Sequence, residues 1–145
     1  MIIINSPHNP CGSMLSNDDL LQLEALTETH GLLVVSDEVY EHLVFDGREH
    51  HSVLQYPALR QRSFALFSFG KTYSVTGWKT GYCFAPPALT AEPRNVHQYV
   101  CFVAVTAIHI AVADFMAPGP DYLDTPGNSY HAKRALSCTP LSGPR

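Results

Sequence analysis

The sequence predicts an α/β fold in which a mostly parallel β-sheet is flanked by helices. Four short apolar runs are typical of buried strands, and they lie at residues 2–5 (IIIN), 32–40 (LLVVSDEVY), 63–71 (SFALFSFGK) and 78–86 (WKTGYCFAP). Continuous apolar runs of this kind are typical of parallel strands that are covered on both faces. A helical segment separates the first two runs and a crossover separates the next two, which is the order expected for a parallel α/β sheet.

The helical segment between the first two runs is predicted at residues 16–30. Ser16 or Asn17 can cap its N-terminus, acidic residues occupy its first turn, and Gly31 can end it. Leucines at positions 20, 23 and 26 have the spacing of one apolar stripe, which we expect to face the sheet.

The C-terminal part predicts two further helices and then a change of character. The helix at residues 91–104 is amphipathic, whereas the one at 106–117 is mostly apolar and is therefore expected to be buried. From Ala117 onwards the chain is rich in proline, glycine and serine. This composition predicts loop, with at most a short helical piece at residues 130–136.

The overall composition excludes several classes of protein. A length of 145 residues favours one domain, and 46% apolar with 15% charged residues is typical of a globular core rather than a disordered chain. The net charge is −4 and the isoelectric point is about 6.0. Neither value indicates a surface for nucleic acid or for an anionic membrane.

The cysteines and histidines predict neither a disulfide framework nor a metal site. The four cysteines, at positions 11, 83, 101 and 138, form no C-x-x-C pair, so we expect reduced, buried thiols in a cytoplasmic protein. His50 and His51 are expected at the surface. No apolar run approaches the roughly 20 residues of a membrane span, and the N-terminal segment lacks the pattern of a secretory signal.

Polar side chains follow three of the predicted strands. Residues 6–10 follow the first, 37–40 end the second, and 68–71 end the third, with Lys79 close behind. Ligands of an open parallel sheet bind beyond the carboxyl ends of its strands, so these groups are expected at one edge. An amine, a carboxylate, a phenol, an amide and a hydroxyl suit pyridoxal phosphate, which needs a Schiff-base lysine, a carboxylate at its ring nitrogen and partners for its phosphate.

The chain also resembles a known family. The segments NSPHNP (5–10), SDEVY (36–40), SFGKT (68–72) and GWKTGY (77–82) resemble the class I/II aminotransferases of fold type I, with the methionine and kynurenine aminotransferase branch as the nearest likeness. The resemblance covers about residues 2–136. It implies a partial large domain at residues 1–136 of a pyridoxal-phosphate-dependent transferase, followed by an irregular tail at 137–145.

The resemblance implies a role for each matching residue. Lys71 forms the Schiff base and later moves the proton at the substrate Cα, and Asp37 pairs with the ring nitrogen. The ring oxygen is bound by Tyr40 and Asn9, and the phosphate by Ser68 and Lys79. A cis peptide bond is expected between Asn9 and Pro10, where the chain turns between two prolines.

The implied activity is transamination between an L-amino acid of methionine, aromatic or kynurenine type and a 2-oxo acid, in a cytoplasmic homodimer that binds neither nucleic acid nor membrane. Two alternatives stay open: a β-lyase for cysteine conjugates on the same scaffold, or a non-catalytic fragment that docks on a full-length homologue. The family's upstream phosphate-binding segment and its downstream substrate-binding arginine have no match here. We therefore expect the middle of a large domain, without full activity on its own.

Overall fold

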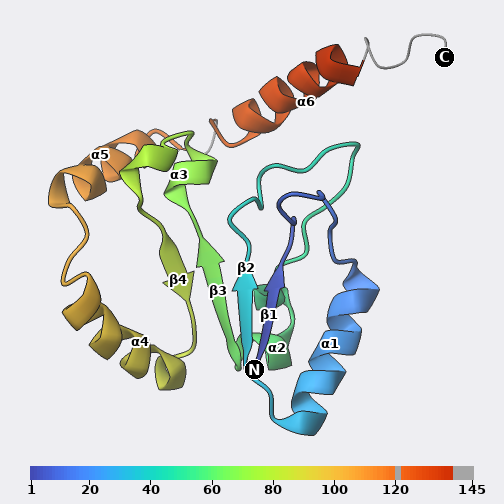
Figure 1. Cartoon of the computed structure of the whole chain (residues 1–145), viewed down its shortest axis with the longest axis vertical. Helices are drawn as coiled ribbons and strands as arrows, with labels where there is room; N and C mark the ends of the chain where they lie inside the picture. The colour runs from blue at the N-terminus through green and yellow to red at the C-terminus, as the bar shows by residue number, and fades with distance from the viewer. Residues whose placement is uncertain (120–121, 139–145) are drawn as a thin grey trace.

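The computed structural model describes residues 1–119 and 122–138 and has an α/β architecture (Figure 1). Its sheet has the strand order β1-β2-β3-β4, in which the first three strands are parallel and β4 is antiparallel to β3. The strands are β1 (Ile2–Asn5), β2 (Val34–Asp37), β3 (Ser63–Phe67) and β4 (Tyr82–Phe84). The helices are α1 (Asn17–His30), α2 (Pro57–Arg60), α3 (Phe69–Thr72), α4 (Pro87–Val100), α5 (Thr106–Met116) and α6 (Asp124–Cys138), with 3₁₀ turns η1 (Val53–Gln55) and η2 (Thr76–Trp78). The predicted fold class is confirmed.

The core lies on the face of the sheet that α1 and α2 cover. Leu20 of α1, Val53 of η1 and Leu59 of α2 are buried against the strands, where Val34 and Phe67 complete the cluster together with Ala65 and Tyr56. Burial alternates along β3, so every second residue faces this core. The sheet and its two covering helices thus form the rigid part of the molecule.

Local signals predicted α1 well. Ser16 caps the helix through a reciprocal capping box with Asp19, and Gly31 ends it in the left-handed conformation with φ of 59°. The predicted apolar stripe is only partly correct. Leu20 is buried and Leu23 packs on the core, but Leu26 is 45% exposed, and Thr27 is the residue buried in that turn.

The strands are shorter than the apolar runs that predicted them. β1 and β2 are in register to Asn5 and Asp37, and the next positions on the first strand lead into Pro7, which has no N–H group to extend the ladder. The remainder of each run forms loops and, after β3, the short helix α3. Both the Ser6–Pro7 and the Asn9–Pro10 bonds are cis, which confirms the expectation for Asn9–Pro10.

The C-terminal helices differ from their predictions. α4 begins at Pro87, because a proline is well placed in a first helical turn, and it ends at Val100 rather than at residue 104. The prediction that the second helix is buried was wrong. In α5 only Val112 is buried, while Ile110 and Phe115 are about half exposed, because nothing within the described residues covers its outer side.

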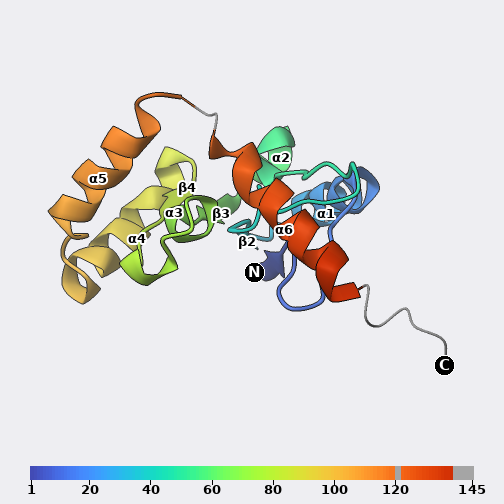
Figure 2. The same ribbon diagram turned by 90° about the horizontal axis from the view of Figure 1, so that it is seen from above.

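The largest difference concerns α6, which occupies residues predicted as loop. Pro126 lies in its first turn, where the missing N–H group has no helical partner to lose. The helix includes the first two residues of the predicted tail, and residues 139–145 lie outside the described part. α6 lies beside the loop after β2, as Figure 2 also shows, with Arg134 bonded to Asp46 at 2.9 Å.

Three of the four cysteines contradict the prediction of buried thiols. Cys11, Cys83 and Cys101 are free and exposed, because Cys11 lies in the turn after β1 and the other two on the little-covered β4 and α4 side. The side chain of Cys138 lies outside the described part. Of the helices in residues 1–119 and 122–138, none is both long and apolar enough to cross a bilayer.

Candidate functional site

Strand register brings three of the predicted polar segments to one edge of the sheet. Asn5 and Leu66 both flank Asp37, so the segments after β1, β2 and β3 leave the sheet at the same level. The Asn5 side-chain amide donates to the Asp37 carbonyl at 2.9 Å, and the Glu38 N–H donates to the Leu66 carbonyl at 2.9 Å. These bonds fix the directions in which the segments depart.

Three predicted site residues meet above this edge. The Asn9 side-chain amide donates to the Tyr40 phenol oxygen at 3.2 Å, and the Lys71 amine lies 5.2 Å from the centre of the Tyr40 ring. Asn9 is itself held by a bond from its N–H to the Asn5 side chain at 3.1 Å. A small cavity of about 250 Å³ adjoins Asn9 and Tyr40, with Pro7, His8, Pro10, Gly12 and Leu43 as its other walls.

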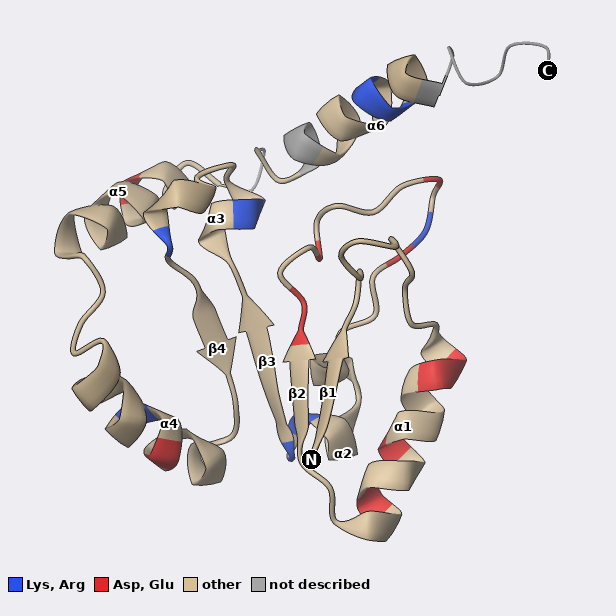
Figure 3. Ribbon diagram, viewed as in Figure 1, with Lys and Arg blue, Asp and Glu red and all other residues tan. Residues whose placement is uncertain are grey.

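Asp37 lies at the end of β2, one residue before the chain leaves the sheet. Its side chain is half-buried, and one carboxylate oxygen accepts from the Val39 N–H at 3.3 Å. Figure 3 shows an acidic tip on β2 and a basic band on α3, the elements that carry Asp37 and Lys71. The strand that holds the carboxylate therefore neighbours the one that leads to the amine.

Ser68 and Lys79 lie on a tightly folded segment between β3 and β4. Ser68 precedes α3, and its hydroxyl does not cap that helix. At Gly81 a Cβ atom would come within 2.3 Å of the Phe67 carbonyl oxygen, so only glycine permits this approach to the end of β3. Lys79 is exposed and left-handed, with φ of 53°. The contacts found among the described residues do not join Lys79 to Tyr40 or Lys71.

These residues fit pyridoxal phosphate by their chemistry. The edge offers one amine, one carboxylate beside it, and an amide and a phenol already aligned with each other. The Tyr40 oxygen accepts from Asn9, so its own proton remains available for another acceptor. The placement of Lys79 away from the other groups leaves the phosphate side the least defined by the observed contacts.

A buried carboxylate beside the site was not predicted as a network. Glu38 is 1% exposed, accepts from the Ser36 hydroxyl at 2.8 Å and the Val53 N–H at 3.1 Å, and lies 2.9 Å from His50 Nε2. Burial acts to raise the pKa of Glu38, but hydrogen bonds from His50, Ser52, Ser36 and Val53 hold it below its ordinary value. His50 is thus largely buried, contrary to the prediction that it is exposed.

Glu41 is a second acid with a changed environment. Burial raises its pKa to about 7, with nearby Glu38 adding to the effect and His50 and the Tyr82 phenol opposing it. Burial also raises the pKa of Tyr82 to about 12, and the charge of Glu41 contributes. Glu41 directly follows Tyr40 in the sequence, but its burial depends on Tyr82, which arrives from β4. No local signal could have indicated this contact.

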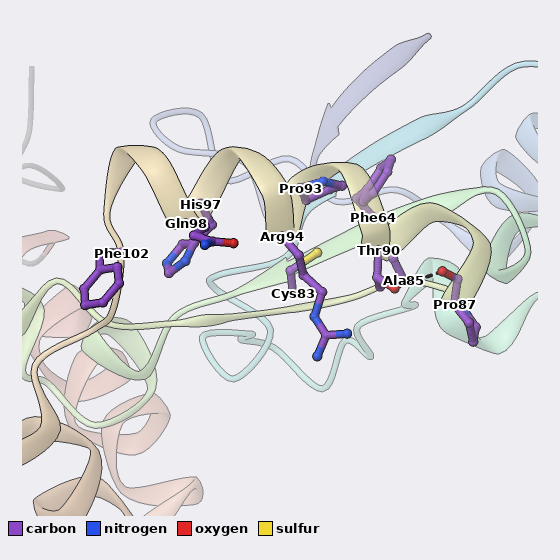
Figure 4. A pocket seen from close by; sticks show the side chains of 10 residues that line it. All are labelled: Phe64, Cys83, Ala85, Pro87, Thr90, Pro93, Arg94, His97, Gln98 and Phe102. Atoms are coloured by element: carbon purple, nitrogen blue, oxygen red, sulfur yellow. Dashed lines mark hydrogen bonds between the residues drawn. The ribbon is translucent and has the colours of Figure 1, made fainter.

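The largest cavity of the described residues lies elsewhere. A groove of about 950 Å³ runs between α4 and the strands β3 and β4, with Phe64, Cys83, Arg94 and Phe102 among its walls (Figure 4). None of the six predicted site residues lines it. The groove therefore reflects the loose packing of α4, in which no residue is buried, and the chemistry-bearing groups mark the carboxyl edge instead.

Comparisons with known proteins agree with this placement. The family model for aminotransferase class I and II matches residues 1–128. Methionine aminotransferase of Escherichia coli is 41% identical over all of this chain, which spans 38% of that protein. Kynurenine–oxoglutarate transaminase of Dictyostelium discoideum is 43% identical over 78% of this chain, or 26% of its own length. The chain thus spans well under half of these curated relatives.

Solved structures give the same result. The crystal structure of Escherichia coli YbdL, reported with a methionine aminotransferase function, matches with a TM-score of 0.88 and 43% identity over 93% of this chain and 36% of that one. N-succinyldiaminopimelate aminotransferase of Mycobacterium tuberculosis matches with a TM-score of 0.89 and 34% identity, over 97% and 37% of the two chains.

Proposed function

Since this chain belongs to the aminotransferase class I and II family, we propose that it carries the cofactor-binding edge of a pyridoxal-phosphate-dependent aminotransferase. The observation that best supports the proposal is the meeting of Asn9, Tyr40 and Lys71 at the carboxyl edge of the sheet. The reaction would transfer an amino group from an L-amino acid to a 2-oxo acid.

When bound, pyridoxal phosphate supplies an aldehyde for the amine and a ring that withdraws electrons from the substrate Cα. We assign Lys71 as the amine that holds the cofactor and afterwards moves a proton at the substrate Cα. Its location on the short helix α3, directly after β3, gives the side chain a fixed starting point. A lysine in this role works because it can give up its proton when its surroundings disfavour the charged form.

Asp37, Tyr40 and Asn9 would orient the ring. The Asp37 carboxylate is the group for the ring nitrogen, whose protonated form it stabilises by opposite charge. Tyr40 would donate its free proton to the ring oxygen, and the second N–H of Asn9 is available for the same acceptor. The bond between the two residues aligns both donors before the cofactor arrives.

Ser68 and Lys79 are proposed as ligands of the phosphate. A hydroxyl and an ammonium group suit a group of about −2 charge. Gly81 supports this assignment indirectly, because its close approach to Phe67 keeps the segment that follows Lys79 against the end of β3.

The substrate class is proposed from the relatives. Two of them are named for methionine and for kynurenine with 2-oxoglutarate. We therefore propose an L-amino acid of methionine, aromatic or kynurenine type with a 2-oxo acid as acceptor. A homodimer and a cytoplasmic location complete the proposal, the first from the family resemblance and the second from the absence of a disulfide pattern in the sequence.

Borohydride reduction tests the central assignment. Lys71, Lys79 and Lys133 are the lysines of the chain, so a peptide map resolves all of them. After incubation with pyridoxal phosphate, reduction should label Lys71 first, and Lys71→Ala should remove the saturable label. Lys133→Ala serves as the matched control, and Lys79→Ala should weaken cofactor binding while the label stays on Lys71. Equal labelling of all three lysines, or a saturable label that survives in Lys71→Ala, would contradict the proposal.

Turnover by this chain alone is expected to be far below that of an ordinary enzyme, for which about 1–10³ s⁻¹ is typical. The reason is the loosely defined phosphate side and the open surroundings of Lys71. An assay of the purified chain with methionine, kynurenine and several 2-oxo acids, saturated with pyridoxal phosphate, measures this directly. Turnover in the ordinary range from a purified monomer would show that the described residues suffice.

A further inference from the structure

The turn after β1 holds a cysteine between two polar side chains. The Cys11 sulfur lies 2.9 Å from Nδ1 of His8 and 3.1 Å from the hydroxyl of Ser13. All three residues come from one short turn, and Cys11 is exposed. A thiol with an imidazole and a hydroxyl at hydrogen-bond distance has the surroundings of a stabilised thiolate, which is the reactive form of cysteine.

The backbone of the turn holds this arrangement in place. The His8 N–H donates to the Ser13 carbonyl at 2.9 Å, and the Gly12 N–H donates to the His8 carbonyl at 2.7 Å. Gly12 has φ of 69°, a conformation that a residue with a Cβ atom rarely adopts. The side chains of His8 and Ser13 are therefore brought to Cys11 by main-chain geometry.

We propose that Cys11 is a thiol modification site at which a thiolate, stabilised by Ser13 and His8, exchanges with small disulfides. In this step the Cys11 sulfur bonds to one sulfur of a disulfide R–S–S–R, whose S–S bond breaks. The products are the mixed disulfide of Cys11 and one thiolate RS⁻, so no further oxidant is required. This inference concerns the thiol itself and stands apart from the proposed aminotransferase function.

Electrostatics agree with the geometry. Hydrogen bonds with Ser13 and then with His8 lower the pKa of Cys11 to about 7, so near neutral pH about half of its population is thiolate. Cys83 shows the opposite behaviour, because burial raises the pKa of its thiol. Among the described residues, His8 is the titratable group in contact with Cys11. The chain thus holds a built-in comparison between two exposed cysteines.

The location of Cys11 adds a second observation. His8, Pro10 and Gly12, which flank the thiol in sequence, all line the cavity of about 250 Å³ beside Tyr40. The ring that contacts the sulfur is therefore also a wall of that cavity. A group attached to Cys11 has an adjoining space to occupy, which Cys83 and Cys101 do not share.

The test follows the pH dependence of disulfide exchange at each cysteine. The reduced chain is treated with 4,4′-dithiodipyridine between about pH 5 and pH 10, the reaction is stopped with acid, and peptide mapping gives one rate for each cysteine. The Cys11 rate should have its midpoint near pH 7. At neutral pH it should exceed that of a thiol of ordinary pKa roughly three- to sixfold, because a larger thiolate fraction outweighs the lower nucleophilicity of a weaker base.

Two variants separate the proposal from simple exposure. His8→Asn and Ser13→Ala should each move the Cys11 midpoint towards the ordinary value of about 8.5 and leave the Cys83 rate unchanged. His30→Asn, an exposed histidine at the end of α1, is the matched control and should leave the Cys11 midpoint in place. A midpoint near 8.5 in the unchanged chain, or one that neither variant moves, would overturn the proposal.

Discussion

The side-chain amide of Asn9 donates a hydrogen bond of 3.2 Å to the phenol oxygen of Tyr40, joining the loop after β1 to the loop after β2. The bond spans two segments that the parallel pairing of β1 and β2 brings together. Because Tyr40 is the acceptor, its hydroxyl proton stays free to face a ligand. The two loops therefore present their donors together rather than independently.

Replacing Tyr40 by phenylalanine tests this relationship. The change removes the acceptor for Asn9 and the proposed donor to the cofactor ring oxygen, at a cost of about 0.5–1.5 kcal/mol for a neutral hydrogen bond. The dissociation constant of pyridoxal phosphate should rise roughly two- to twelvefold. Titration of the bound cofactor's absorbance measures it. Tyr99→Phe, at a tyrosine that is 87% exposed on α4, is the control and should bind as the unchanged chain does.

Glu38 should be important for stability. Glu38→Ala leaves the Ser36 hydroxyl, the Val53 N–H and His50 without their buried acceptor, which should lower the free energy of unfolding by at least about 3 kcal/mol. The folded-state pKa of Glu38 is depressed, so its contribution is present above the unfolded pKa and is lost as the pH falls through the folded pKa. Urea unfolding of this variant should thus differ most from the unchanged chain near neutral pH. Exposed Glu49 offers the control, Glu49→Ala, for which a comparable loss would argue against the buried network.

Glu41 predicts the opposite pH dependence. Its pKa rises from 4.5 to about 7 on folding, so folding stability should fall as the pH rises from about 4.5 to 7, while the unfolded chain releases the proton and the folded chain retains it. The difference amounts to about 3 kcal/mol for a side chain that is 20% exposed. Glu41→Gln should therefore be more stable than the unchanged chain at pH 8 and similar at pH 4.5. Equal differences at both pH values, measured by urea unfolding, would rule this explanation out.

Gly81 should tolerate no side chain. Gly81→Ala would place a methyl group 2.3 Å from the Phe67 carbonyl oxygen, so the main chain must shift, at a cost of about 1–3 kcal/mol. Gly77→Ala is the matched control, because nothing lies within 4 Å of the added atom. The midpoint of urea unfolding should fall clearly in the first variant and change little in the second. Similar midpoints for the two variants would mean that the segment before β4 relaxes freely.

Sequence patterns predicted the elements whose signals are local. Ser16 and Gly31 mark the ends of α1 through bonds within a few residues, and the polar groups after β1, β2 and β3 meet because parallel strands end at one edge. Asn9, Tyr40 and Lys71 could be placed together for this reason. The roles of all six site residues stay predictions until the cofactor experiments are done.

Features that depend on distant contacts were missed. His50 is buried only because Glu38 draws it in from an irregular crossover, and Glu41 is desolvated by Tyr82 from another strand. Composition misjudged α5 and α6 for a related reason. An apolar helix is buried only if another element covers it, and a segment rich in proline and glycine can be helical when its proline lies in the first turn.

The close approach of Gly81 to Phe67 also has a kinetic consequence. It closes the stretch that carries Lys71 and Lys79 into a small loop, with Thr76 bonded back to the Gly70 carbonyl at 3.0 Å. Loops of about ten residues close in roughly 10–100 ns, whereas pairing of parallel strands requires much longer segments to be brought together. During folding, both lysines should therefore reach their relative positions early, before the strand pairs that bring Asn9 and Asp37 to the same edge.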